Sequence, residues 1–163
     1  MIRRFSSAVL LLGCVWGGDA LAQPVFDIQP TTDCLEAVGA EGDRAQCIGV
    51  AANDCMTNDS STAGMSYCLE MEWTWWDDEL NYAYQEAKSQ AEAADSDLSP
   101  PLNVQAVGLR DMQRAWIAFR DARCNWEAAL WQGGTGAGPA QLSCLMVETG
   151  RQTMALQNAA LGD

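Results

Sequence analysis

The sequence predicts an all-α protein: a small disulfide-stapled helical bundle with two long antiparallel helices, a C-terminal helix and a short N-terminal helical segment. Apolar residues recur at spacings of three and four over three long segments, which is the periodicity of an amphipathic helix. No segment alternates apolar and polar residues for long enough to indicate a strand. The six cysteines beyond residue 22 form an even set, which is typical of exported proteins stapled by disulfides.

The first 22 residues have the features of an export signal. Two arginines precede a short apolar run, and residues 20–22 (Ala-Leu-Ala) match the A-x-A cleavage pattern. Residues 1–22 are therefore predicted to be a signal peptide, 23–64 a disulfide-bonded extension and 65–163 the main helical domain. The apolar run is too short to span a bilayer. We expect a periplasmic or secreted protein, or alternatively a lipoprotein anchored through Cys14, which ends a lipobox-like sequence.

The charge balance restricts the class of partner. The whole chain has a formal net charge of −13, and residues 23–163 alone hold 7 basic and 21 acidic side chains, a net charge of −14. Nucleic acids and anionic membranes need basic patches, so neither is expected as a partner. A basic protein partner fits this charge, and so does simple solubility outside the cytoplasm.

The cysteine spacing favours one of 15 possible pairings. The separation of the first two cysteines equals that of the next two, which suggests that neighbours pair, although a crossed Cys34–Cys68 bond stays open. The predicted bonds are Cys34–Cys47, Cys55–Cys68 and Cys124–Cys144. The sequence has no histidine and no C-x-x-C, so neither a metal nor another cofactor is predicted.

The helices can be placed by periodicity and by their breakers. We expect an irregular lead-in over 23–42 with one helical turn near Cys34, then helices over 43–56, 65–94, 102–131 and 140–160. A double proline at 100–101 separates the two long helices, and a glycine-rich connector precedes the last one. The buried seam of the first long helix is predicted to comprise Leu69, Trp73, Trp76, Leu80, Tyr84, Ala87 and Ala91.

The second long helix carries a polar group inside its apolar face. Gln113, Trp116, Arg120 and Cys124 fall on one stripe, which is widened by Met112, Phe119, Trp126 and Leu130. A buried guanidinium needs partners, because an unpaired buried charge costs several kcal/mol. We therefore expect a structural polar cluster that fixes the helix register: Asp77, Asn81, Gln113 and Arg120.

Three ordered strings lie in the C-terminal two thirds of the chain: Asp77-x-x-Leu80-Asn81-x-x-Tyr84, Leu109-Arg110-x-x-Gln113-Arg114-x-Trp116-Ile117-x-Phe119-Arg120-Asp121-x-x-Cys124, and Gly133-Gly134, Cys144 and Thr149-x-Arg151. Over residues 66–157 the chain thereby resembles the LprI-type lysozyme-inhibitor family. The resemblance implies a small exported bacterial helical protein, with inhibition of lysozyme as the named activity. The N-terminal cysteines lie outside the part that carries the resemblance.

No constellation in the sequence indicates catalysis. The adjacent carboxylates Asp77, Asp78 and Glu79 point about 100° apart on a helix, whereas glycoside hydrolysis needs two carboxyl groups facing each other across a sugar. No histidine base and no nucleophile motif is present. The chain is therefore not expected to be an enzyme.

The far side of the first long helix is the candidate partner-binding face. Two aromatics framed by four acids suit a basic protein surface, unless the N-terminal segment folds over them. The candidate residues are Glu72, Trp75, Asp78, Glu79, Tyr82 and Glu86. The first hypothesis is occlusion of a basic partner such as lysozyme. The alternatives are a cell-wall glycan-binding module, with the aromatics as stacking platforms, and an envelope structural protein. The oligomeric state is not predicted.

Overall fold

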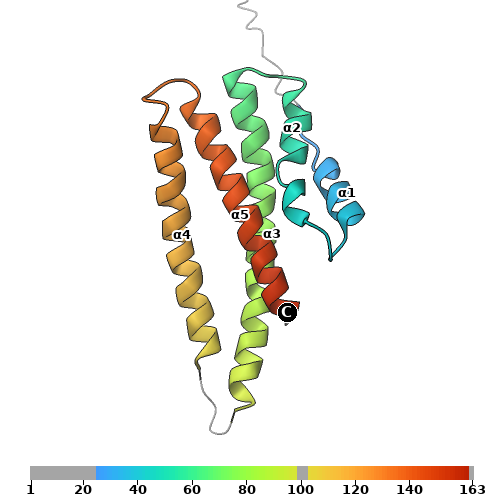
Figure 1. Cartoon of the computed structure of the whole chain (residues 1–163), viewed down its shortest axis with the longest axis vertical. Helices are drawn as coiled ribbons and strands as arrows, with labels where there is room; N and C mark the ends of the chain where they lie inside the picture. The colour runs from blue at the N-terminus through green and yellow to red at the C-terminus, as the bar shows by residue number, and fades with distance from the viewer. Residues whose placement is uncertain (1–24, 99–102, 162–163) are drawn as a thin grey trace, which may run out of the picture.

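The computed structural model describes residues 25–98 and 103–161, and every regular element in these ranges is helical (Figure 1). The all-α fold class is thus confirmed. The elements are α1 (Gln29–Val38), the 3-10 helix η1 (Arg44–Cys47), α2 (Val50–Met56), α3 (Thr62–Ser96), α4 (Gln105–Ala129) and α5 (Ala137–Leu161). The predicted signal peptide, Cys14 and the double proline lie outside the described residues.

Helix α3 is the centre of the molecule. It runs antiparallel to α4, with α5 alongside both, while α1 and α2 cover its opposite side (Figure 1). The closest partner of α3 is α5, and α4 contacts α5 more extensively than it contacts α3. The two long helices are therefore bridged by the C-terminal helix, and α4 forms one edge of the bundle.

The core follows the contact between α3 and α5. Near the disulfide-rich end it contains Trp76, which is only 1% exposed, together with methionines of α5 and apolar side chains of the N-terminal helices. Gly150 on α5 permits the close approach, because a Cβ atom there would lie 2.8 Å from Ile48 Cδ1 and 3.2 Å from Trp76 Cδ2. A second cluster, around Leu80 and Leu156, continues the core toward the other end.

The N-terminal segment differs from the expectation in two ways: its first helix is longer, and its second helix is interrupted. The predicted single turn near Cys34 is the ten-residue helix α1, which has Pro30 in its first turn, where proline is well tolerated. The predicted continuous helix over 43–56 is wrong. It is interrupted at Gly49, whose φ of 92° is left-handed and suits glycine, so η1 and α2 form two separate pieces.

The three predicted disulfides are present: Cys34–Cys47, Cys55–Cys68 and Cys124–Cys144. The first connects α1 to η1, the second α2 to α3 and the third α4 to α5. The N-terminal segment is thus covalently joined to α3 and contributes Leu35, Ile48 and Met56 to the same core.

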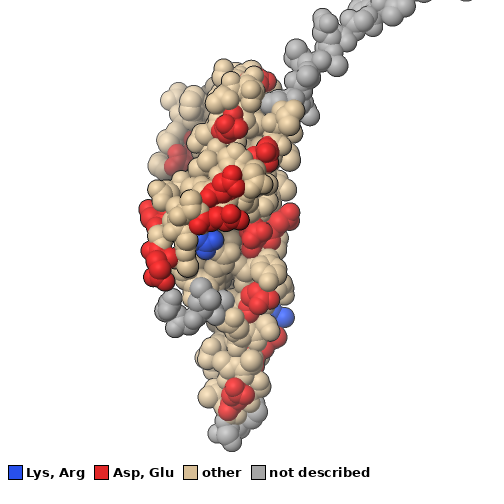
Figure 2. Space-filling model, turned by 90° about the vertical axis from the view of Figure 1, so that its right-hand side faces the viewer, with Lys and Arg blue, Asp and Glu red and all other residues tan. Residues whose placement is uncertain are grey.

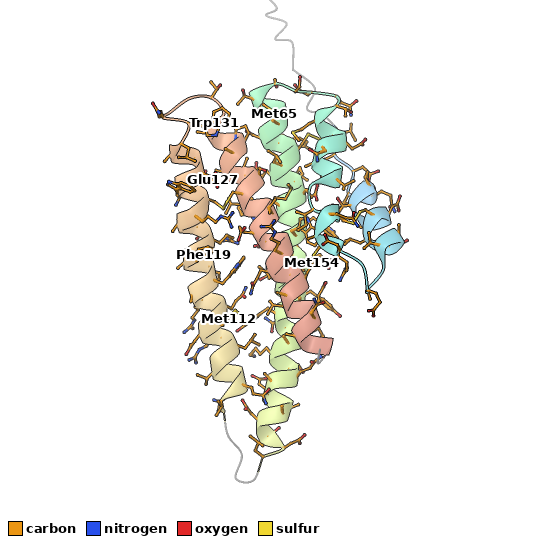
Figure 3. The ribbon with its side chains drawn as sticks, in the orientation of Figure 1. Met65, Met112, Phe119, Glu127, Trp131 and Met154 are labelled. Atoms are coloured by element: carbon orange, nitrogen blue, oxygen red, sulfur yellow. A yellow bond between two sulfur atoms is a disulfide. The ribbon has the colours of Figure 1, made fainter. Side chains whose placement is uncertain are left out.

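The expected broad apolar face of α4 is only partly buried. Gln113 and Cys124 face the bundle, but Met112, Phe119 and Trp126 are 43%, 57% and 59% exposed. Figure 3 labels Met112 and Phe119 on this outer helix. The reason is the position of α4 at the edge, where α5 and α3 cover one side of it.

Among the described residues, none of the helices combines the length and the apolar character that a membrane span needs.

Candidate functional site

The candidate face on α3 is divided by the N-terminal helices into a covered part and an open part. Glu72 belongs to the covered part and is fully buried. Its Oε1 accepts hydrogen bonds from the Thr31 hydroxyl (3.1 Å), the Gly49 N–H (2.7 Å) and the Trp76 indole N–H (3.1 Å). Its Oε2 accepts from the Ala52 N–H at 2.7 Å. Because Glu72 satisfies the first N–H groups of α2, it joins the N-terminal segment to α3 and cannot contact a partner directly.

Trp75 also contributes to packing. Its side chain is half-buried against the core, and its ring meets that of Trp76 edge-on, with 4.6 Å between the ring centroids and an interplanar angle of 72°. One of the two aromatics expected on the binding face is therefore partly used in packing against the core.

The remaining four candidates stay accessible. Asp78 and Glu86 are exposed, Glu79 is half-buried, and Tyr82 is 64% exposed. They lie on the same side of α3, since position 82 is four residues from 78 and from 86 and three residues from 79, and residues three or four apart share a helix face. An exposed tyrosine among carboxylates is a common element of protein interfaces, because its ring offers contact area at a small cost in conformational entropy.

The charge of the molecule is divided between its two halves. Residues 25–98, which form α1 to α3, contain sixteen acidic and two basic side chains, a net charge of −14. Residues 103–161, which form α4 and α5, contain four acidic and five basic side chains, a net charge of +1. We call the first set the acidic half. Figure 2 looks onto its side of the molecule and shows acidic side chains along the length of this face, with few basic ones.

The expected polar cluster exists only in part. Arg120, whose side chain is 12% exposed, lies with Nη1 3.7 Å from an Asp77 carboxylate oxygen and with its guanidinium 5.1 Å from the centre of the Trp116 ring. Asn81 donates to Asp77 at 3.4 Å rather than bonding to Arg120. Gln113 does not join this group, because it accepts from the side chain of Gln152 on α5 at 3.0 Å.

Backbone N–H groups lower the pKa values of two carboxyl groups, those of Asp95 and Asp59. Asp95, at the end of α3, accepts from the N–H groups of Ala106, Gln105 and Val104 at the start of α4. The bond from Ala106 is the main reason that the pKa of Asp95 lies below its ordinary value, and burial opposes the shift. The pKa of Asp59 is lowered chiefly by the Ser61 N–H. Both groups act as caps beside helix starts and therefore have structural roles.

The accessible chemistry of the acidic half is that of a binding surface. Among residues 25–98 and 103–161, no group of three or more Asp, Glu, Cys or His side chains is arranged to hold a metal ion. What the surface offers is a dense set of carboxylate acceptors around a partly exposed aromatic side chain, which complements cationic groups such as lysine and arginine.

The N-terminal helices contribute to this surface, which the periodicity of α3 alone does not indicate. Exposed acids on α1 and in the segment between α1 and η1 extend it well beyond α3: Asp33, Glu36, Glu41 and Asp43. Counting charges segment by segment, rather than over the whole chain, would have revealed the division, because it is present in the order of the residues.

Comparisons with known proteins identify a family and a relative of this chain. The model of the family described as "Lysozyme inhibitor LprI" matches residues 34–156, a range that includes all six paired cysteines. A 17.7 kDa protein of Rhodobacter capsulatus, described as uncharacterized and located in the puhA 5′ region, is 25% identical over 138 residues, which cover 81% of this chain and 85% of that protein. No solved structure matches the chain.

Proposed function

The chain belongs to the LprI family of lysozyme inhibitors, and we propose that it is a periplasmic or secreted binding protein whose acidic half docks onto a basic partner such as lysozyme. Residues 1–22 would direct its export and be removed. Inhibition would result from occlusion of the partner's active site, with no chemical change in either protein.

The division of charge is the observation that carries this proposal. One half of the molecule has a net charge of −14 and the other a net charge of +1, so the negative electrostatic field is concentrated on one side. Such a field steers a cationic protein toward α1–α3 and accelerates encounter at low ionic strength. A surface charged only for solubility needs no such asymmetry.

The shape of the acidic half supports occlusion rather than loose attraction. Asp78, Tyr82 and Glu86 lie on one continuous 35-residue helix, so their relative positions are fixed before binding. The N-terminal helices beside them are fixed by two disulfides and by the buried Glu72 carboxylate. A preorganised surface loses little conformational entropy on binding, which favours affinity.

The direct test is lysozyme turnover on cell walls, with and without the oxidised protein. We expect inhibition that weakens when Asp78→Asn and Glu86→Gln are combined. The matched control combines Asp111→Asn and Asp121→Asn on α4, which changes the net charge equally but on the other half. Both variants should retain the helical circular dichroism of the wild type.

The outcomes separate the proposal from its rivals. Electrostatic docking should lose affinity as sodium chloride rises, because exposed charges are screened beyond about 10 Å at 0.1 M salt. Normal turnover at a many-fold excess of the protein would overturn the proposal. Salt-insensitive binding to isolated cell walls, without lysozyme, would instead assign the surface around Tyr82 to glycan stacking.

A further inference from the structure

Helix α4 carries an apolar stripe that nothing in the described chain covers. Its positions alternate at spacings of four and three, and all seven are exposed: Gly108, Met112, Ala115, Phe119, Ala122, Trp126 and Ala129. We call these residues the α4 stripe. A spacing of four and three is that of a helix surface packed against a second helix. In a monomer, a row of large apolar side chains on an edge helix would remain in contact with water, and such patches usually mark interaction sites.

Large and small residues alternate strictly along the α4 stripe. Met112, Phe119 and Trp126 occupy one set of positions at intervals of seven. The other set holds alanine throughout, at Ala115, Ala122 and Ala129. Helices pack well where a large side chain faces a small one, because ridges then fit into grooves without voids.

An antiparallel pairing of two α4 helices brings every large residue opposite an alanine. In a single register, Phe119 faces Ala122 of the second copy, and Ala122 faces the second Phe119 in return. The same register sets Met112 against the second Ala129 and Ala115 against the second Trp126. This reciprocity is what a two-fold axis requires, since the same surface must serve both partners.

The charge distribution selects a second copy as the occupant. The acidic half repels another copy of itself, whereas the half that includes α4 has a net charge of only +1. In the antiparallel register, Arg123 beside the stripe comes level with Ala118 of the second copy, and no like charges face each other across the seam. Two molecules can therefore meet through α4 while their acidic halves point apart.

We infer that the protein forms a two-fold symmetric dimer through antiparallel packing of the α4 stripe. A covered Phe or Trp buries about 150–250 Å². Phe119 and Trp126 are more than half exposed, so each copy still offers on the order of 100 Å² at each aromatic residue. With Met112, Leu130 and the alanines, the contact approaches the roughly 1,200 Å² at the lower limit of stable interfaces. The dimer is therefore weak and reversible, with a dissociation constant of about 10–100 μM.

Sedimentation velocity of the oxidised mature protein, from about 1 μM to about 1 mM, tests the inference. We expect a shift from monomer to dimer across this range, strengthened by added salt because repulsion between acidic halves is screened. Phe119→Glu should weaken dimerisation at least tenfold. The matched control is Ile117→Glu on the same helix, which is 41% exposed but outside the α4 stripe and should dimerise as the wild type does.

The register has its own test. Ala122→Phe places a large residue opposite Phe119 and should weaken the dimer, while the exchange Phe119→Ala with Ala122→Phe restores large-against-small packing and should recover it. A monomer at all concentrations overturns the inference, as does equal loss in Phe119→Glu and Ile117→Glu. A wild-type monomer that co-floats with lipid vesicles assigns the α4 stripe to a membrane surface and also overturns it. The result is independent of lysozyme inhibition, which is predicted to weaken with salt.

Discussion

A single carboxylate at residue 72 links three segments of the chain. Glu72 accepts four hydrogen bonds from α1, from the start of α2 and from its own helix, inside the core. We expect Glu72→Gln to destabilise the fold by roughly 2 kcal/mol or more, because its amide would turn an N–H toward the Ala52 N–H. Thermal unfolding monitored by circular dichroism measures this loss.

The control for Glu72 is Glu79→Gln, two helical turns further along α3 and half-exposed. A surface substitution of this kind should change stability by less than about 0.5 kcal/mol. Equal melting temperatures for the wild type and Glu72→Gln would contradict the role of Glu72 as the link between α3 and the N-terminal helices.

Arg120 is a second residue whose removal should affect folding rather than binding. Its guanidinium lies over Trp116 and beside Asp77 with little exposure. Arg120→Ala should cost roughly 1–2 kcal/mol through lost packing and pairing. Arg110→Ala, whose side chain is 46% exposed, should cost less than about 0.5 kcal/mol. If Arg120→Ala melts normally but abolishes lysozyme inhibition, its role is in binding.

The difference between Glu72 and Tyr82 shows what residue patterns can predict about the candidate site. Helical periodicity placed both on one side of α3, and that side is indeed where the N-terminal helices and the acidic surface meet. Periodicity could not tell which was covered. The burial of Glu72 depends on N–H groups freed at Gly49 and Ala52, where the expected helix is broken.

At the scale of elements, the junction between α3 and α4 depends on one cap. Asp95 stays ionised below the usual range of an aspartate because its folded pKa is depressed, chiefly by the Ala106 N–H. Its stabilising effect is therefore complete above the unfolded pKa of about 3.9 and is lost as the pH falls through the lower folded value. Asp95→Asn should lower the melting temperature at pH 7.

The pH dependence provides the control for this cap. The gap between the wild type and Asp95→Asn should narrow as the pH falls below about 4, because the wild-type carboxyl group then becomes protonated. A gap that stays constant down to about pH 2 would show that the charge of Asp95 contributes nothing, and that only the shape of the side chain matters.

The long helices were predictable from sequence because periodicity extends over many turns. The expected segments 65–94 and 140–160 lie within α3 and α5. Periodicity could not show which helices are neighbours in the bundle. Trp116 and Phe119 both read as apolar positions of α4, but α5 lies between much of α4 and α3, so Phe119 faces outward. Which side of an amphipathic helix is covered depends on its neighbours, and these follow from the tertiary arrangement.

At the scale of the whole molecule, repulsion between the carboxylates of the acidic half lowers the stability of the fold, and added salt should reduce this loss. The sixteen acidic side chains in residues 25–98, which are balanced by only two basic ones, repel one another in the folded state. Added salt screens this repulsion, so we expect the melting temperature at pH 7 to rise by several degrees between about 10 mM and about 0.5 M sodium chloride. Differential scanning calorimetry of dilute Phe119→Glu, which keeps dimerisation from contributing, measures the effect.

The direction of this salt effect distinguishes two accounts of the stability. If ion pairs such as Arg123–Glu148, with 2.6 Å between the charged atoms, dominated the electrostatics, salt would lower the melting temperature instead. Near pH 3 most exposed carboxyl groups are neutral, and the stabilisation by salt should disappear. A cationic partner that binds α1–α3 would also reduce this repulsion between carboxylates. We therefore expect lysozyme to raise the melting temperature of this protein at low ionic strength, where salt does not screen the repulsion.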